Sequence, residues 1–175
     1  KSPGRHRLPL CERLAEELAR VAHAAPEERR RHLAEAGWTA LVSVEIENVA
    51  REREKFLTHF KGRPSVNPED EPDTLLYVAF TVAWTVVRAA IESQGIYPNH
   101  RTQCLDDFKR TCGHLVDLEW FEQLFNAWEN WESGAPDVTT TATWCQGVAN
   151  AARILHDTLG SRDPEDFAGW PPRTI

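Results

Sequence analysis

The sequence lacks the short motifs that would assign it to a familiar enzyme class. No glycine-rich phosphate loop, no G-x-S-x-G nucleophile elbow and no H-E-x-x-H zinc motif occurs in its 175 residues. It also contains no methionine, which we interpret as processing or trimming of the chain. Because no nucleophile, base and orienting residue come together visibly, the sequence does not predict a catalytic reaction.

Long hydrophobic runs and a secretory signal are also missing. The longest apolar run, from Leu75 to Val87, is interrupted by Thr81 and Thr85 and is shorter than the roughly 20 residues that span a bilayer. The N-terminus is basic, but no apolar segment follows it. With 41% hydrophobic and 27% charged residues, the chain is expected to be one soluble, cytoplasmic domain with a buried core.

Cysteine is scarce, and the four cysteines have no disulfide-framework spacing, which fits a reducing compartment. The sequence contains two arrays of metal-ligand residue types: His100, Cys104, Cys112 and His114, and Glu45, Glu52 and His59. The first is H-x3-C-x7-C-x-H, whose cysteines lie too far apart for the close pairs typical of structural zinc. The second recurs every seven residues but lacks the Glu-x-x-His that di-iron bundles use. We therefore predict no metal and no cofactor.

The charges are divided unevenly along the chain. Lys1 to Lys61 carries 12 Lys/Arg and 10 Asp/Glu, a net charge of +2, whereas Gly62 to Ile175 carries 8 and 17, a net charge of −9. The one basic cluster, Arg29-Arg30-Arg31, follows two glutamates and is predicted to be a solvated helix face. The alternative is an accessory protein that contacts nucleic acid through these arginines, although phosphate binding needs a more concentrated basic surface.

Helical periodicity dominates, and no Asn-Gly or Asp-Gly hairpin signal occurs. We predict an all-α, single-domain antiparallel bundle of about five to six helices over residues 10 to 159, with an N-terminal tail at 1 to 9 and an irregular C-terminal tail at 160 to 175. A short charged turn of helix is expected from Glu27 to Ala36. The main helices are expected at about Leu10 to Ala24, Trp38 to Phe60, Thr74 to Gln94, His100 to Thr111, Leu118 to Glu132 and Val138 to Leu159.

The ends and faces of these helices are also predictable. Asp73 is the expected N-cap of the Thr74 to Gln94 helix and Gly95 its C′ residue, while Asp117 and Asp137 are expected to cap the last two helices. The few polar positions of the Thr74 to Gln94 helix fall within a sector of about 60°, so it should be the central, most buried helix.

Two features are candidate binding sites. Arg53 projects from the apolar stripe of the Trp38 to Phe60 helix and is interpreted either as a structural ion pair or as an anion-binding or interface arginine. The Leu118 to Glu132 helix holds five of the chain's 16 aromatic residues. Most should be core, but some could form an exposed patch for a partner beside the helix's acidic side. The candidate binding residues are Arg53, Trp120, Glu122, Trp128 and Trp131.

A long apolar helix ends in the segment Arg88 to His100, and it is followed by a short helix and then by Leu118-Glu119-Trp120-Phe121. From Asp73 to Leu159 this layout resembles the HEPN superfamily of small helical bundles. With the Trp38 to Phe60 helix in front, it covers roughly two thirds of the chain. Such families act as metal-independent ribonucleases in toxin and defence systems, or as inactive partners of nucleotidyltransferases.

Active members of that superfamily carry an Arg-x4-6-His motif late in the bundle. Here the corresponding stretch, Phe125 to Glu132, contains neither residue. Arg53 and His59 satisfy the spacing, but they lie on an earlier helix and point to different faces. The resemblance therefore implies a non-catalytic member, with no catalytic residues to carry over.

We accordingly expect a non-catalytic interaction module that binds a protein partner, such as a nucleotide-handling enzyme or a component of a defence or toxin system. A homodimer is also expected, because antiparallel bundles dimerise readily. The alternative from a different class is a metal-independent HEPN-like ribonuclease that uses Arg53 and His59.

Overall fold

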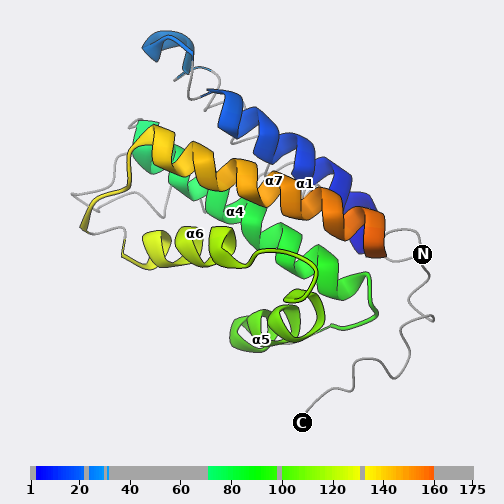
Figure 1. Cartoon of the computed structure of the whole chain (residues 1–175). Helices are drawn as coiled ribbons and strands as arrows, with labels where there is room; N and C mark the ends of the chain where they lie inside the picture. Colours follow the sequence, from blue (N-terminus) through cyan, green and yellow to red (C-terminus); the bar gives the residue numbers. More distant parts are fainter. Residues whose placement is uncertain are drawn as a thin grey trace.

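The computed structural model describes residues 3–21, 24–29, 31, 71–97, 100–130 and 133–159. Within these ranges the regular structure is helical and contains no strand, which confirms the predicted all-α bundle. The predicted Trp38 to Phe60 helix and the C-terminal tail lie outside the described residues. The described residues form five helices of more than ten residues (Figure 1): α1 (Pro3–Val21), α4 (Glu71–Glu92), α5 (Arg101–Cys112), α6 (Glu119–Glu129) and α7 (Val138–Leu159).

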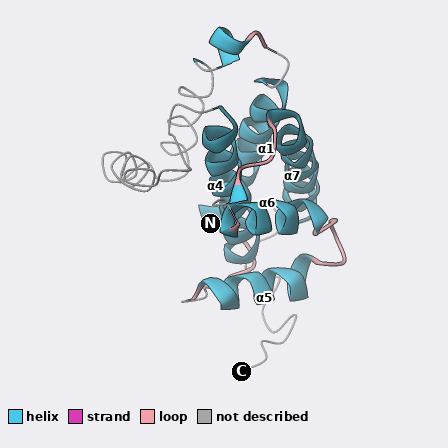
Figure 2. Ribbon diagram, turned by 90° about the vertical axis from the view of Figure 1, so that its left-hand side faces the viewer, coloured by secondary structure: helices cyan, strands magenta, loops and turns pink. Residues whose placement is uncertain are grey.

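Helix α4 holds the bundle together, because it packs against each of the other four helices. It lies beside α1 and α7, with α1 running in the opposite direction to both (Figure 1). Helix α6 packs on α4 and α7, and α5 lies at the far side of the bundle from α1 (Figure 2). The residues of α4 that face these neighbours are fully buried, and they include Val82, Ala83, Val86 and Ala90. The prediction that this helix is the central one is confirmed.

The polar residues of α4 are accommodated within the helix itself. The Thr81 hydroxyl donates to the carbonyl of Tyr77 at 3.0 Å, and the Thr85 hydroxyl donates to the carbonyl of Thr81 at 2.8 Å. By length and composition Leu75–Glu92 is apolar enough to cross a membrane, and 67% of this segment is buried inside the protein, as in the core helix of a bundle.

The C-terminal end of α4 follows the sequence prediction closely. Gly95 has a φ of 77°, the left-handed region that glycine adopts without a steric penalty. The N–H of Ile96 donates to the carbonyl of Ile91 at 3.1 Å, and the N–H of Gly95 donates to the carbonyl of Glu92 at 3.0 Å. This pair of bonds is a Schellman motif, which satisfies carbonyls that the helix end leaves open.

Two helix starts differ from the prediction. Helix α4 begins at Glu71, so Asp73 lies inside its first turn and is not the N-cap; Pro72 fits there because the first helical residues need no N–H partner. Helix α1 begins at Pro3, where an N-terminal tail had been expected, and continues through Pro9. The reason is visible in the burial pattern, since fully buried Leu8 extends the inner stripe of Cys11 and Leu18 upstream of the proline.

Helix α7 has the predicted bounds, and its first turn is capped as expected. The Asp137 carboxylate accepts a hydrogen bond from the Thr140 backbone N–H at 2.7 Å, and this bond holds the pKa of Asp137 below its usual range. The apolar residues that recur at heptad-like spacing along α7 are all buried: Cys145, Val148, Ala152, Leu155 and Leu159.

The lowered pKa of Asp137 gives stability a defined pH dependence. A carboxyl whose pKa is lower in the folded state stabilises the fold above its unfolded pKa, and this contribution is lost as the pH falls through the folded value. Asp137→Asn keeps an acceptor for the Thr140 N–H but removes the titration. We expect the melting temperature of the wild type to fall more steeply between about pH 7 and about pH 3 than that of Asp137→Asn.

In the same experiment Asp137→Ala, which removes the acceptor, should melt below both proteins at about pH 7. Identical pH profiles for the wild type and Asp137→Asn would contradict the cap.

Gly147 of α7 leaves room for an indole ring from α6. A Cβ atom placed on Gly147 would lie 2.2 Å from Cγ of Trp120 and 2.3 Å from Cδ2, inside the rigid part of the ring. Only glycine therefore allows Trp120 to pack against α7 in this position.

This contact reverses the usual effect of a glycine-to-alanine substitution. In a helix interior alanine is normally favoured over glycine by about 1 kcal/mol. At position 147 the overlap with Trp120 should instead make Gly147→Ala destabilising by about 1 to 3 kcal/mol in urea unfolding. The exposed Asn150→Ala on the same helix should change the free energy of unfolding by less than about 0.5 kcal/mol. A Gly147→Ala protein as stable as the wild type would show that Trp120 does not pack here.

Candidate functional site

Helix α6 divides into an apolar inner face and a polar outer face. Phe121, Leu124, Phe125 and Trp128 are buried against the bundle. The carboxylate of Asp117 accepts a hydrogen bond from the Glu119 N–H at 2.9 Å, which confirms the predicted role of Asp117 at the start of the helix. The sequence therefore predicted the start of α6 and that most of its aromatic residues belong to the core, but not that Trp128 is one of them.

Aromatic residues of α6 pack against aromatic rings of α4 and α5. The ring of Trp128 lies 5.2 Å from Tyr77 and 5.3 Å from Phe80, the latter in a stacked arrangement. Phe125 meets Phe80 and Trp84 edge-on at 5.7 and 5.8 Å. Such pairs add about 0.5 to 1.5 kcal/mol each beyond the area they bury. The aromatic excess of α6 thus serves to cover α4.

This packing separates the candidate binding residues from one another. Trp128 is 8% exposed and lies in the core, Trp120 is half-buried against Gly147, and Glu122 is exposed. Trp131, Arg53 and His59 lie outside the described residues. The three described candidates share one helix but do not form one surface, and Glu122 alone lies on the outer face.

The outer face of α6 carries only carboxylates and amides. Their spacing of three and four residues places them in one continuous stripe along the helix. All six are exposed: Glu119, Glu122, Gln123, Asn126, Glu129 and Asn130. We call these six residues the α6 outer face.

The α6 outer face lies in a stretch of chain without positive side chains. No Lys or Arg occurs between Arg110 and Arg153. The same stretch contains six acidic residues, Asp117, Glu119, Glu122, Glu129, Glu132 and Asp137. The excess of acidic residues after Lys61 indicated a negative surface somewhere in the second part of the sequence. The net charge of so long a segment did not indicate which helix carries it.

One lysine reaches the α6 outer face from a neighbouring helix. Nζ of Lys109 on α5 lies 3.8 Å from Oε1 of Glu122, and both side chains are 53% exposed. An exposed pair of this kind contributes about 0 to 1 kcal/mol. The contact therefore leaves the negative character of the face in place.

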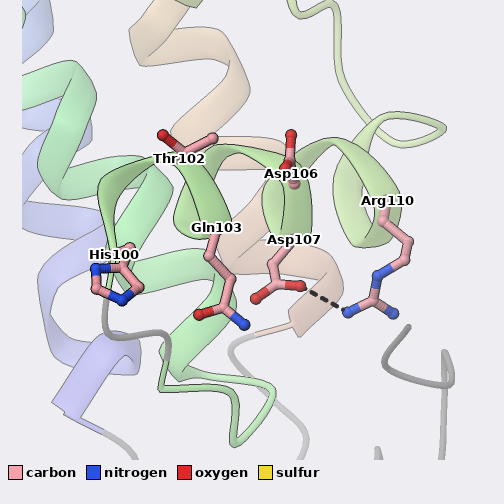
Figure 3. Close-up of a pocket in the computed structure, with 6 residues that line it drawn as sticks. All are labelled: His100, Thr102, Gln103, Asp106, Asp107 and Arg110. Carbon is pink, nitrogen blue, oxygen red and sulfur yellow. Dashed lines mark hydrogen bonds and ion pairs between the residues drawn. The ribbon is translucent and has the colours of Figure 1, made fainter. Parts of the chain in front are cut away.

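The outer side of α5 borders an open depression of about 780 Å³ (Figure 3). Its described lining residues come from α5 and the residue that precedes it: His100, Thr102, Gln103, Asp106, Asp107 and Arg110. Nη2 of Arg110 donates to Oδ1 of Asp107 at 2.9 Å, and Asp107 is buried. The pairing neutralises the buried carboxylate of Asp107, and the other carboxylate of the lining, Asp106, is exposed at the surface.

The histidines and cysteines at the start and end of α5 do not form a ligand set. Among the described residues no group of three or more His, Cys, Asp and Glu side chains is placed to hold a metal ion. Cys104 and Cys112 are buried, while His100 and His114 are exposed. Glu45, Glu52 and His59 lie outside the described residues.

Burial also makes the described thiols poor nucleophiles. Removal from water raises the pKa of Cys104 and of Cys112 to about 11 and that of Cys145 to about 12. The Gln94 amide and the Thr111 hydroxyl lie 3.5 and 3.4 Å from Sγ of Cys112. These contacts lower the pKa of Cys112, but by less than burial raises it.

We therefore expect slow alkylation of the native protein. At about pH 8 a thiol with a pKa of about 11 is ionised in roughly one molecule per thousand. Iodoacetamide should leave Cys104 and Cys112 largely unmodified in the native protein and should modify all four cysteines after denaturation, as counted by mass spectrometry. Rapid labelling of either residue in the native protein would contradict the buried thiol sites.

The basic cluster that follows α1 is described in part. Nη1 of Arg29 donates to the carbonyl of Ala24 at 3.1 Å and the side chain is half-buried, whereas Arg31 is exposed. Arg30 lies outside the described residues. An arginine that folds back onto its own chain is a poorer phosphate ligand than a free one.

Comparison of the chain with protein-family models, with curated proteins and with solved structures finds no match. The resemblance to the HEPN superfamily therefore stays a prediction from the layout of the helices, and the fold and the α6 outer face carry the functional argument.

Proposed function

We propose that this protein is a non-catalytic interaction module whose α6 outer face binds a positively charged segment of a partner protein. The observation that carries the proposal is the one-sided chemistry of α6. The described aromatic side chains of the helix pack towards the bundle, and its carboxylates and amides are exposed on the opposite face. In the sequence this face has no Lys or Arg of its own between Arg110 and Arg153.

Charge complementarity argues for a basic partner. Carboxylates at positions 119, 122 and 129 are spaced so that they follow one side of the helix. A Lys- or Arg-rich segment can pair with them, while Gln123, Asn126 and Asn130 supply uncharged donors and acceptors between the charges. Lys109 on Glu122 shows the same pairing within the chain.

The described surface has few exposed large hydrophobic side chains from which an apolar interface could form. Among the described residues the large hydrophobic side chains with substantial exposure are Tyr97, 58% exposed, and Ile154, 39% exposed. They lie on different elements, the connector after α4 and helix α7. Obligate homodimers normally bury a contiguous apolar patch, so these residues do not favour the expected homodimer.

Binding through exposed charges has characteristic energetics. Each exposed ion pair contributes about 0.2 to 1 kcal/mol, and salt screens it over about 10 Å at 0.1 M. Electrostatic attraction accelerates encounter more than it slows dissociation. The complex should therefore be reversible and sensitive to ionic strength.

The test replaces the three α6 carboxylates by their amides. Glu119→Gln/Glu122→Gln/Glu129→Gln keeps the side-chain shapes and removes three negative charges. Binding of a fluorescent lysine-rich helical peptide, measured by anisotropy at low salt, should weaken about tenfold, because three pairs at about 0.5 kcal/mol each amount to about 1.5 kcal/mol. Wild-type binding should itself fall as the salt concentration rises.

A matched control separates this face from the overall negative charge. Glu16→Gln/Asp106→Asn/Asp157→Asn changes the net charge by the same amount at exposed positions on α1, α5 and α7. It should bind the peptide nearly as well as the wild type. Equal losses in both triple variants would overturn the assignment of α6. Affinity purification from the native host with the same three proteins then asks whether a partner is lost from the α6 variant alone.

One assay decides between this function and the ribonuclease alternative. Labelled RNA is incubated without metal with the wild type and with Arg53→Ala/His59→Ala. We expect no cleavage by either protein. Cleavage by the wild type that disappears in the double variant would replace the interaction module with a HEPN-like ribonuclease. Salt-sensitive RNA binding without cleavage, lost on Arg29→Ala/Arg30→Ala/Arg31→Ala, would favour the nucleic-acid accessory role instead.

A further inference from the structure

We draw no further inference here: the strongest candidate, the open depression along α5 between His100 and Arg110, carries nothing because its described lining comes from one side of a single helix and its buried carboxylate, Asp107, is already paired with Arg110 at 2.9 Å.

Discussion

The burial of α4 is the constraint on which the rest of the structure depends. A helix that is apolar around most of its circumference must be covered on every side, since each large apolar side chain left in water forfeits about 1.5 to 3 kcal/mol. In this protein the cover is supplied by four separate helices, α1, α5, α6 and α7. Each of these helices turns an apolar face towards α4.

The same constraint explains why α6 is rich in aromatic residues. Tyr77, Phe80 and Trp84 lie on one side of α4, and large side chains let a helix of 11 residues cover this surface. Phe125 and Trp128 do so, and Phe121 extends the cluster to Phe108 on α5. An aromatic-rich helix can look like an exposed binding patch in sequence, yet here the rings are the cover of the central helix. What remains exposed on α6 is the opposite, polar face.

The sequence predicted those parts of the fold that depend on local chemistry. The Schellman end at Gly95, the caps at Asp117 and Asp137 and the inward positions of α7 each follow from residue type and spacing within one helix. The start of α1 could not be found this way, because Pro9 usually marks the beginning or end of a helix, and only the burial of Leu8 shows that α1 continues upstream of it. At α4 the sequence offered Asp73 as the N-cap, two residues after the observed start at Glu71. The contact between Trp120 and Gly147 could not be predicted either, because it joins α6 and α7, and no local sequence pattern determines how two helices are placed relative to each other. For the candidate site, sequence identified Glu122 and the polar sector of α6, but whether Trp128 faces a partner or the core depends on rings contributed by α4.

The packing of α6 limits what its outer face can do. Because Trp120 and Trp128 are committed to the bundle, the face has no large apolar side chain to act as an anchor, and anchors of that kind normally supply most of the affinity in a protein interface. In the proposed interface the carboxylates and amides would act together, each contributing little, so the proposed recognition would depend on matching several charges along the helix. A rigid helix suits this task, because the packing of Phe121, Leu124 and Phe125 fixes the spacing of the carboxylates on the other side. The interaction that stabilises the centre of the bundle is thus also what orders the surface proposed to bind a partner.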